Sequence, residues 1–199
     1  MNITKILLEQ KAVLLSPNKP FTWTSGIKSP IYCDNRKLIS NVKARDIITN
    51  QLIKTLEKED VDIIAGTATA GIPWASFIAQ KLNKPLIYVR SKPKGHGTAK
   101  TIEGEFEKGK KVVIIEDLIS TGKSSLNSVR EVKNAGGIVN LCIGIFSYGF
   151  GMAVDGFTKE NVKLVTLSDF TELVEEAIKE NYIKKEDKEM LETWRKEFL

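Results

Sequence analysis

The fold is decided by residues 112–125, which read VVIIEDLISTGKSS. The apolar run at 112–115 is long enough for a buried strand, and two carboxylates, Glu116 and Asp117, follow it directly. A short Ser/Thr/Gly turn comes next, and apolar residues then recur at helical spacing as far as Gly136. A strand, turn and helix in this order leave free backbone N–H groups at the helix N-terminus, where a phosphate group can bind.

The acidic pair sets this turn apart from an ordinary strand-to-helix connection. Carboxylates repel phosphate, so we expect Glu116 and Asp117 to face sugar hydroxyls or a magnesium ion. Gly122-Lys123-Ser124 also resembles the end of the triphosphate-binding pattern G-x-x-x-x-G-K-[ST]. That pattern needs a glycine at position 117, where this chain has an aspartate, so a triphosphate loop is disfavoured.

Length and composition indicate one α/β domain with a sizeable core. The chain has 199 residues, of which 42% are hydrophobic and 28% charged. Its net charge of +5 is spread along the chain without a basic block, so we expect no nucleic-acid partner. No apolar run approaches the roughly 18 residues of a membrane span. The two cysteines, Cys33 and Cys142, have no metal-like spacing, which favours the reducing cytoplasm.

Helical and strand patterns alternate along most of the chain. We predict helices over residues 2–15, 41–58, 70–82, 121–135, 168–180 and 185–198, strands over 61–65, 85–90, 112–115, 138–146 and 162–167, and a hairpin or short strands within 20–34. Continuous apolar strands separated by helices predict a mainly parallel central sheet covered on both faces. Ligands of such sheets bind beyond the carboxyl ends of the strands.

Three loops fall at that edge, at residues 66–71, 91–104 and 116–124. The first is made of small residues with hydroxyls at Thr67 and Thr69, which suits close backbone approach to a ligand. The second holds several cations and the only histidine of the chain, and it is either a solvated charged loop or a functional lid. Together the loops match a substrate with a diphosphate, a ribose and a monophosphate.

With these motifs the chain resembles the type I phosphoribosyltransferases. Their phosphoribosyl diphosphate fingerprint is a hydrophobic strand, two acidic residues and a Thr/Ser-Gly turn, which residues 112–125 match throughout. Residues 21–32, FTWTSGIKSPIY, resemble the N-terminal hood of the orotate-specific members. Residues 90–97, RSKPKGHG, resemble their catalytic lid. The resemblance runs in order over residues 1–180.

The resemblance implies a Rossmann-like phosphoribosyltransferase fold in one domain. Residues 1–40 would form the N-terminal helix and hood, 41–180 the α/β core with a mobile lid at 91–104, and 181–199 a C-terminal helix. The implied reaction is magnesium-dependent transfer of ribose 5-phosphate from phosphoribosyl diphosphate to N1 of orotate. It also implies a cytoplasmic homodimer that shares its lids between subunits, with no nucleic-acid or membrane partner.

Carried over residue by residue, the resemblance makes Lys94 and Asp117 catalytic and gives Ser120 a contact with orotate. It implies that phosphoribosyl diphosphate is bound by Arg90, Lys94, His96, Glu116, Asp117, Leu118, Ile119, Ser120, Thr121, Gly122, Lys123 and Ser124. Magnesium would be held mainly by the substrate diphosphate, with protein ligands that the resemblance leaves unknown.

Two other functions are open at this point. The first is transfer to another base, since Thr24 and Thr69-Ala70 stand where many orotate-specific members carry lysine. The second is a non-catalytic sensor of phosphoribosyl diphosphate. Regulators of that kind usually carry an added DNA-binding domain, and the first predicted helix, at 2–15, is too short for a helix-turn-helix.

Overall fold

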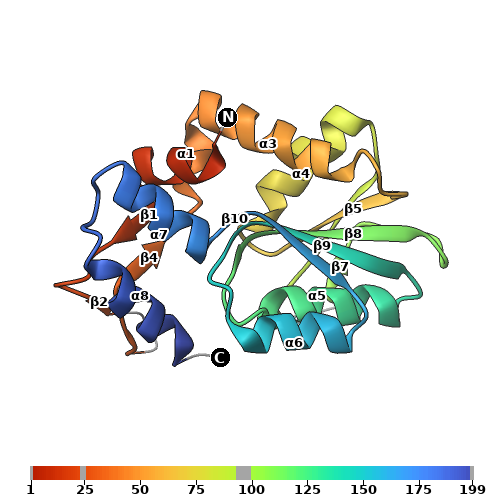
Figure 1. Ribbon diagram of the computed structural model, residues 1–199. Helices are drawn as coiled ribbons and strands as arrows, with labels where there is room; N and C mark the ends of the chain where they lie inside the picture. Colours follow the sequence, from red (N-terminus) through yellow and green to blue (C-terminus); the bar gives the residue numbers. More distant parts are fainter. Residues whose placement is uncertain (1, 23–25, 93–99, 198–199) are drawn as a thin grey trace.

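The computed structural model describes residues 2–22, 26–92 and 100–197, and in them a six-stranded sheet forms the centre of the molecule (Figure 1). The strand order is β10-β9-β8-β5-β6-β7, and every neighbouring pair is parallel except β6 with β7. The strands are β5 (Ile63–Thr67), β6 (Leu86–Val89), β7 (Ile102–Glu103), β8 (Lys111–Ile119), β9 (Ile138–Ser147) and β10 (Lys163–Asp169). The prediction of a mainly parallel sheet is confirmed.

Helices cover both faces of this sheet (Figure 1). On one face lie α3 (Val42–Leu56) and α4 (Gly71–Leu82), and on the other lie α5 (Lys123–Asn134) and α6 (Gly151–Lys159). Strand β8 shows why: Val113 and Ile115 pack into the core with Trp74, whereas Val112 and Ile114 pack into the core on the opposite face. Burial on both faces explains the unbroken apolar run of this strand.

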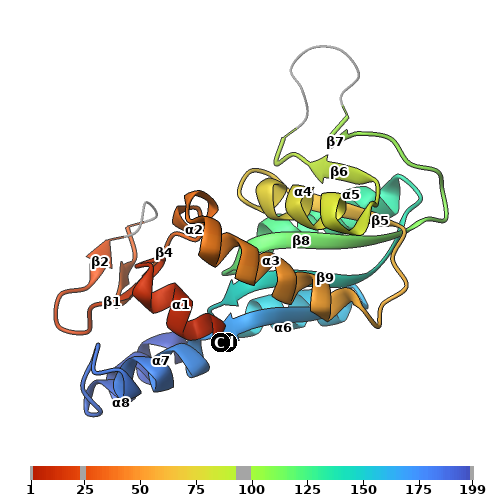
Figure 2. The ribbon, with the colours of Figure 1, turned by 90° about the horizontal axis from the view of Figure 1, so that it is seen from above.

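A smaller part of the molecule stands beside the β10 side of the sheet (Figures 1 and 2). It comprises α1 (Ile3–Glu9), β1 (Val13–Leu15), β2 (Phe21–Thr22), β3 (Lys28–Ser29), β4 (Ile31–Cys33), α2 (Lys37–Ser40), α7 (Phe170–Lys179) and α8 (Asp187–Lys196). Strands β2, β3 and β4 are the short strands predicted within residues 20–34. Strand β2 pairs with β3, and β4 pairs with β1, both in antiparallel orientation. The indole of Trp194 donates to the carbonyl of Lys28 at 3.1 Å, so the last helix holds this hood in place.

The structure differs from the predicted elements in several places. The helix expected at 2–15 ends at Glu9, because Lys11 takes a left-handed conformation (φ 53°) and Val13 then pairs with Cys33 in a strand. Helix α6 lies in a segment for which the sequence predicted no element. Strand β8 continues to Ile119, because β9 pairs with it that far, so the acidic pair lies inside a strand and not after one.

The sheet has its topological switch between β5 and β8. From β5 the chain continues to β6 on one side, and from β8 it continues to β9 on the other, while β5 and β8 pair in parallel. The segments that follow these two strands therefore leave the same edge of the sheet side by side, which is where ligands of open α/β sheets bind.

Two glycines let helix α4 lie close against the sheet, one against β8 and one against β5. A Cβ on Gly71, the first residue of α4, would overlap the carbonyl oxygen of Ile115. A Cβ on Gly66 would lie 2.9 Å from the Cα atom of Ile72, closer than real Cβ atoms approach. The close contacts of α4 with β8 at Gly71 and with β5 at Gly66 are thus available only to glycine.

Across residues 2–22, 26–92 and 100–197, every helix is too short or too polar to cross a membrane.

We expect Gly71→Ala to lower the free energy of unfolding by about 3 kcal/mol, since the added methyl group must displace the backbone of β8. Gly109→Ala is the control, because the space around Gly109 is open and only its φ of 84° disfavours alanine; a loss of about 1 kcal/mol is expected there. Urea unfolding measures both. A loss for Gly71→Ala no larger than for the control would contradict the close contact.

Candidate active site

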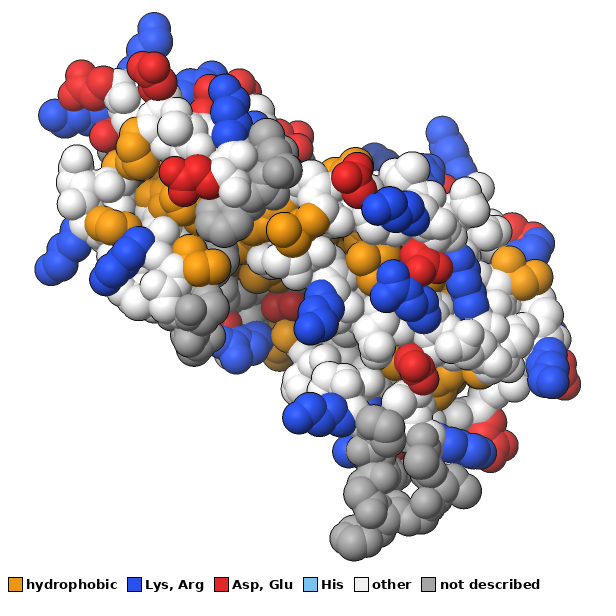
Figure 3. Space-filling model, turned by 90° about the horizontal axis from the view of Figure 1, so that it is seen from below, with side chains coloured by type: hydrophobic (Ala, Val, Ile, Leu, Met, Phe, Trp, Pro, Cys, Tyr) orange, Lys and Arg blue, Asp and Glu red, His pale blue; other side chains and the backbone are white. Residues whose placement is uncertain are grey.

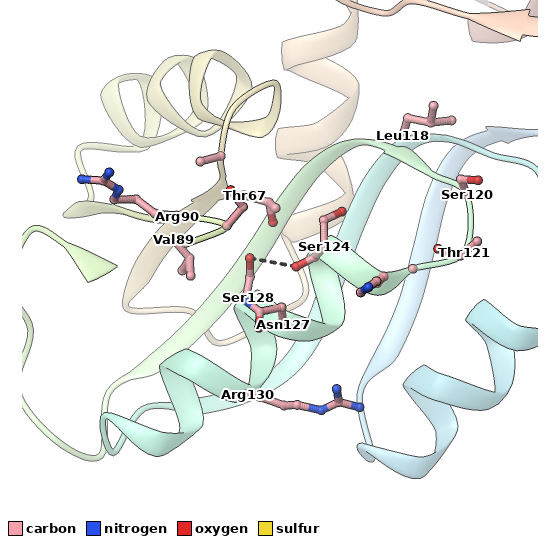
Figure 4. Close-up of a pocket in the computed structure, with 14 residues that line it drawn as sticks. Thr67, Val89, Arg90, Leu118, Ser120, Thr121, Ser124, Asn127, Ser128 and Arg130 are labelled. Carbon is pink, nitrogen blue, oxygen red and sulfur yellow. Dashed lines mark hydrogen bonds between the residues drawn. The ribbon is translucent and has the colours of Figure 1, made fainter. Parts of the chain in front are cut away.

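A cavity of about 480 Å³ opens at the switch point, between the end of β6, the segment after β5 and the turn that joins β8 to α5 (Figure 4). Its lining residues are Thr67, Ala68, Val89, Arg90, Ser91, Leu118, Ser120, Thr121, Gly122, Lys123, Ser124, Asn127, Ser128 and Arg130. The structure thus brings seven of the predicted site residues to one cavity, namely Arg90, Leu118, Ser120, Thr121, Gly122, Lys123 and Ser124. The predicted Lys94 and His96 lie outside the described residues.

The turn at residues 120–124 has the geometry of an anion site. Gly122 takes a left-handed conformation (φ 76°) and is the N-cap of α5, so it brings no side chain to cap the helix. The first backbone N–H groups of a helix have no partner within it, and they carry the positive end of its dipole. Because this helix N-terminus opens into the cavity, a phosphate group can be bound there by backbone N–H groups and hydroxyls.

Glu116 supports this turn from inside the protein. Its side chain is buried, and one carboxyl oxygen accepts hydrogen bonds from the hydroxyls of Ser125 (3.0 Å) and Ser124 (3.2 Å). The other oxygen accepts from the N–H of Asp117 at 3.1 Å. Glu116 therefore joins the end of β8 to the first turn of α5, and it is absent from the cavity lining. Burial, and next the charge of Asp117, raises the pKa of Glu116 to about 8.

Asp117 is the more open carboxylate of the pair. Its side chain is half-buried, and burial raises its pKa as well. Its carbonyl accepts a hydrogen bond of 2.6 Å from the side-chain amide of Asn35, a residue that follows the hood strand β4. Viewed from below, the molecule has a hollow between its two parts in which acidic side chains are visible (Figure 3). Ile119, predicted as a binding residue, is fully buried in the core.

On the opposite side of the cavity lie Thr67 and Arg90. The Thr67 side chain is buried at the end of β5, and its hydroxyl has no hydrogen-bond partner among the described residues. The guanidinium of Arg90 lies 3.2 Å from the carboxylate of Glu103. A cation and a hydroxyl on this side complement the anion-binding turn on the other.

Few side chains at this site could ligate a divalent metal ion. In the part of the chain that the structure describes, no three His, Cys, Asp or Glu side chains come together as a metal site. Glu116 and Asp117 directly precede the lining residue Leu118 on β8 but are not themselves among the lining residues, and Glu116 is engaged by Ser124 and Ser125. The residues present therefore fit a hard cation that receives most of its oxygen ligands from a bound substrate.

Residues 38–147, which include both strands of the switch point and the turn, match the family model described as a phosphoribosyl transferase domain. The chain belongs to the phosphoribosyltransferase family. The resemblance drawn from residues 112–125 is thereby confirmed.

Relatives of this phosphoribosyltransferase carry a more specific name. It is 49% identical to an orotate phosphoribosyltransferase of Listeria monocytogenes, over 98% of this chain and 94% of the relative. It is 50% identical to one of Staphylococcus aureus, over 97% of this chain and 96% of the relative. The crystal structure of orotate phosphoribosyltransferase from Aeropyrum pernix superposes with a TM-score of 0.78 at 31% identity, covering 87% of this chain and 97% of that one. These similarities place the phosphoribosyltransferase among the orotate-specific members.

The structure adds lining residues that the sequence did not indicate. Asn127 and Ser128 reach the cavity from the first turns of α5 (Figure 4), and their spacing of three and four residues from Ser124 is a signal that could have found them. Asn35 and Glu103 form hydrogen bonds with Asp117 and Arg90, which lie 82 and 13 positions away in the chain, and no local pattern marks either residue.

The pKa of Glu116 predicts how stability depends on pH. Because its pKa is higher in the folded than in the unfolded protein, the native state keeps a proton that the unfolded chain releases between about pH 4.5 and 8. The free energy of unfolding therefore falls as pH rises through this window. The variant Glu116→Gln lacks this carboxyl group. We therefore expect its free energy of unfolding to fall over the window by a few kcal/mol less than that of the wild type, as the size of the pKa shift implies.

Urea unfolding at about pH 5 and about pH 8.5 measures this difference. Glu105→Gln is the control, since it removes one carboxylate from an exposed position. Parallel pH dependence in Glu116→Gln and the wild type would show that Glu116 is ionised in both states.

Proposed function

We propose that the protein catalyses the magnesium-dependent transfer of ribose 5-phosphate from phosphoribosyl diphosphate to N1 of orotate, giving orotidine 5′-monophosphate and diphosphate. The observation that carries this proposal is the cavity at the switch point, in which an anion-binding turn lies across from Thr67 and Arg90. The acidic pair directly precedes the lining residue Leu118 on β8. The orotate phosphoribosyltransferases that the chain is similar to support the choice of base.

We assign one orientation to phosphoribosyl diphosphate in the cavity. The 5′-phosphate binds at the turn of residues 120–124, where the α5 dipole favours an anion. Asp117 takes the ribose hydroxyls, with Glu116 behind it. The diphosphate then points toward Thr67 and Arg90, and Ser120 is placed to contact orotate. Lys94 and His96, which lie outside the described residues, are assigned to the diphosphate by the resemblance.

The chain's own residues stabilise charge separation in the reaction. The C1′–O bond breaks, its electron pair leaves with the diphosphate, and the ribose becomes cationic at C1′. Orotate releases its N1 proton to solvent, and N1 then attacks the opposite face of that carbon and forms the new bond with inversion. Arg90 and Lys94 stabilise the departing anion, and the carboxylate of Asp117 stabilises the ribose cation. Exclusion of water from the cavity keeps the ribose from being hydrolysed.

Magnesium is the expected cofactor, and Asp117 is the protein group best placed to contribute an oxygen ligand beside those of the diphosphate. When bound, the ion neutralises the charge of the leaving group. We propose a homodimer that shares its lids, as the resemblance implies. The unpaired thiols of Cys33 and Cys142 are typical of the reducing cytoplasm, where we place the enzyme.

An absorbance assay tests the function directly. Wild-type protein mixed with phosphoribosyl diphosphate, Mg²⁺ and orotate should consume the ultraviolet absorbance of orotate, and omission of Mg²⁺ should stop the reaction. Uracil and the purine bases are the matched alternatives and should not react. Turnover of one of them without turnover of orotate would mean that the base is wrong, although the transferase class is right.

A variant separates the enzyme from a non-catalytic sensor. Lys94→Ala should lower kcat by about a hundred-fold or more, since it removes one cation from the leaving group, while calorimetry should still detect substrate binding. Tight binding of phosphoribosyl diphosphate by wild-type protein that turns over no base would contradict catalysis and favour the sensor.

A further inference from the structure

The short strand β7 pairs with the end of β6 at the edge of the sheet. The two strands are antiparallel, with Tyr88 opposite Glu103 and Val89 opposite Ile102. The N–H of Arg90 donates to the carbonyl of Thr101 at 2.8 Å, which extends the pairing beyond β6. The chain that leaves β6 beside the cavity and the chain that returns are therefore joined at their bases.

Glu103 contacts a cavity residue from this strand. Its carboxylate accepts a hydrogen bond of 3.2 Å from Nη1 of Arg90, and the side chains of Arg90 and Glu103 are about one-third (35%) and one-quarter (24%) exposed. A guanidinium has five N–H groups in a planar fork, so a bond to one of them fixes its plane and leaves other N–H groups for a ligand. Figure 4 shows Arg90 at the margin of the cavity, on the end of β6.

The backbone of Glu103 is itself held on both sides. The hydroxyl of Thr101 donates to the carboxylate of Glu131 on α5, the helix whose N-terminus forms the anion-binding turn. Gly104 has a φ of 92°, and a Cβ there would lie 3.0 Å from the side chain of Ile87 and 3.2 Å from the carbonyl of Leu86. Close packing on β6 and a hydrogen bond to α5 thus fix the point from which Glu103 reaches Arg90.

Stability alone gives little reason for this ion pair. A partly exposed pair of this kind contributes about 0–1 kcal/mol to folding, because solvent screens it and both side chains lose freedom. Its position is more informative: the arginine lines the cavity, and the carboxylate lies on the strand behind it. A long side chain that is already ordered loses less entropy when it binds an anion.

We propose that Glu103 is a positioning residue that holds the guanidinium of Arg90 in place for the diphosphate of the substrate. The proposal deepens the proposed function and rests on it for the identity of the ligand. Glu103 itself contacts no substrate: it acts through Arg90, and its negative charge would otherwise weaken anion binding at the cavity.

Calorimetric titration with phosphoribosyl diphosphate and Mg²⁺ tests the proposal in four proteins: wild type, Glu103→Ala, Arg90→Ala and the double variant. Glu103→Ala should raise Kd about three- to ten-fold, the effect of releasing one long side chain. Glu103→Gln keeps an acceptor oxygen and should restore part of the affinity. In the Arg90→Ala background, Glu103→Ala should raise Kd no further, since a residue that acts through Arg90 has nothing left to position.

Glu105→Ala is the matched control, because it removes the same charge from an exposed side chain two residues away and should not raise Kd. An equal rise in Kd in both backgrounds would show a general structural effect and overturn the proposal. A fall in Kd for Glu103→Ala would overturn it in the other direction, as Glu103 would then compete with the substrate for Arg90.

The same samples are assayed for turnover of orotate. Absence of turnover in the wild type would contradict the proposed function, while the Kd series would still decide the role of Glu103. Absence of any binding of phosphoribosyl diphosphate by the wild type would overturn both.

Discussion

The buried carboxyl group of Glu116 joins the end of strand β8 to the start of helix α5, and the anion-binding turn lies between the two points that it connects. Its hydrogen bonds to Ser124 and Ser125 fix the first turn of the helix against the strand. The close contact of Gly71 with β8 places the segment after β5 beside that turn. With both loops held to the same strand, the cavity between them is built before a ligand arrives, so binding requires little reordering of the backbone.

Two carboxylates next to a phosphate site need an electrostatic explanation. Burial raises the pKa of Glu116 to about 8 and also raises that of Asp117, so the pair holds a proton more readily than two free carboxylates would and repels a phosphate less. The two members of the pair differ in their surroundings: Glu116 is buried and holds the turn through Ser124 and Ser125, whereas Asp117 is the more open carboxylate.

The sequence predicted those parts of the structure that depend on local pattern. The apolar run of residues 112–115, buried on both faces, and the glycine-containing turn that follows were sufficient for the parallel sheet and the anion site. Prediction failed where contacts distant in the chain decide: residues 13–15 form a strand because β4 pairs with them. Helix α6 was missed because Gly156 weakens its helical pattern. That glycine brings α6 close to α5, since a Cβ there would lie 2.5 Å from Cδ1 of Leu126, whose side chain would have to move.

The candidate site shows the same division. The turn and Arg90 follow from motifs, whereas Asn35 and Glu103 form hydrogen bonds with residues 82 and 13 positions away. Such contacts exist only once the fold has formed, and no spacing in the sequence indicates them.

The central claim is that the cavity has a monophosphate end at the turn and a diphosphate end at Thr67 and Arg90. Amide N–H spectra of the ¹⁵N-labelled protein, titrated separately with ribose 5-phosphate and with inorganic diphosphate, test it most directly. Ribose 5-phosphate should shift the amide signals of residues 120–125, and diphosphate those of 67–70 and Arg90. Shifts of one common set of residues by both ligands, or an unresponsive turn, would contradict the account.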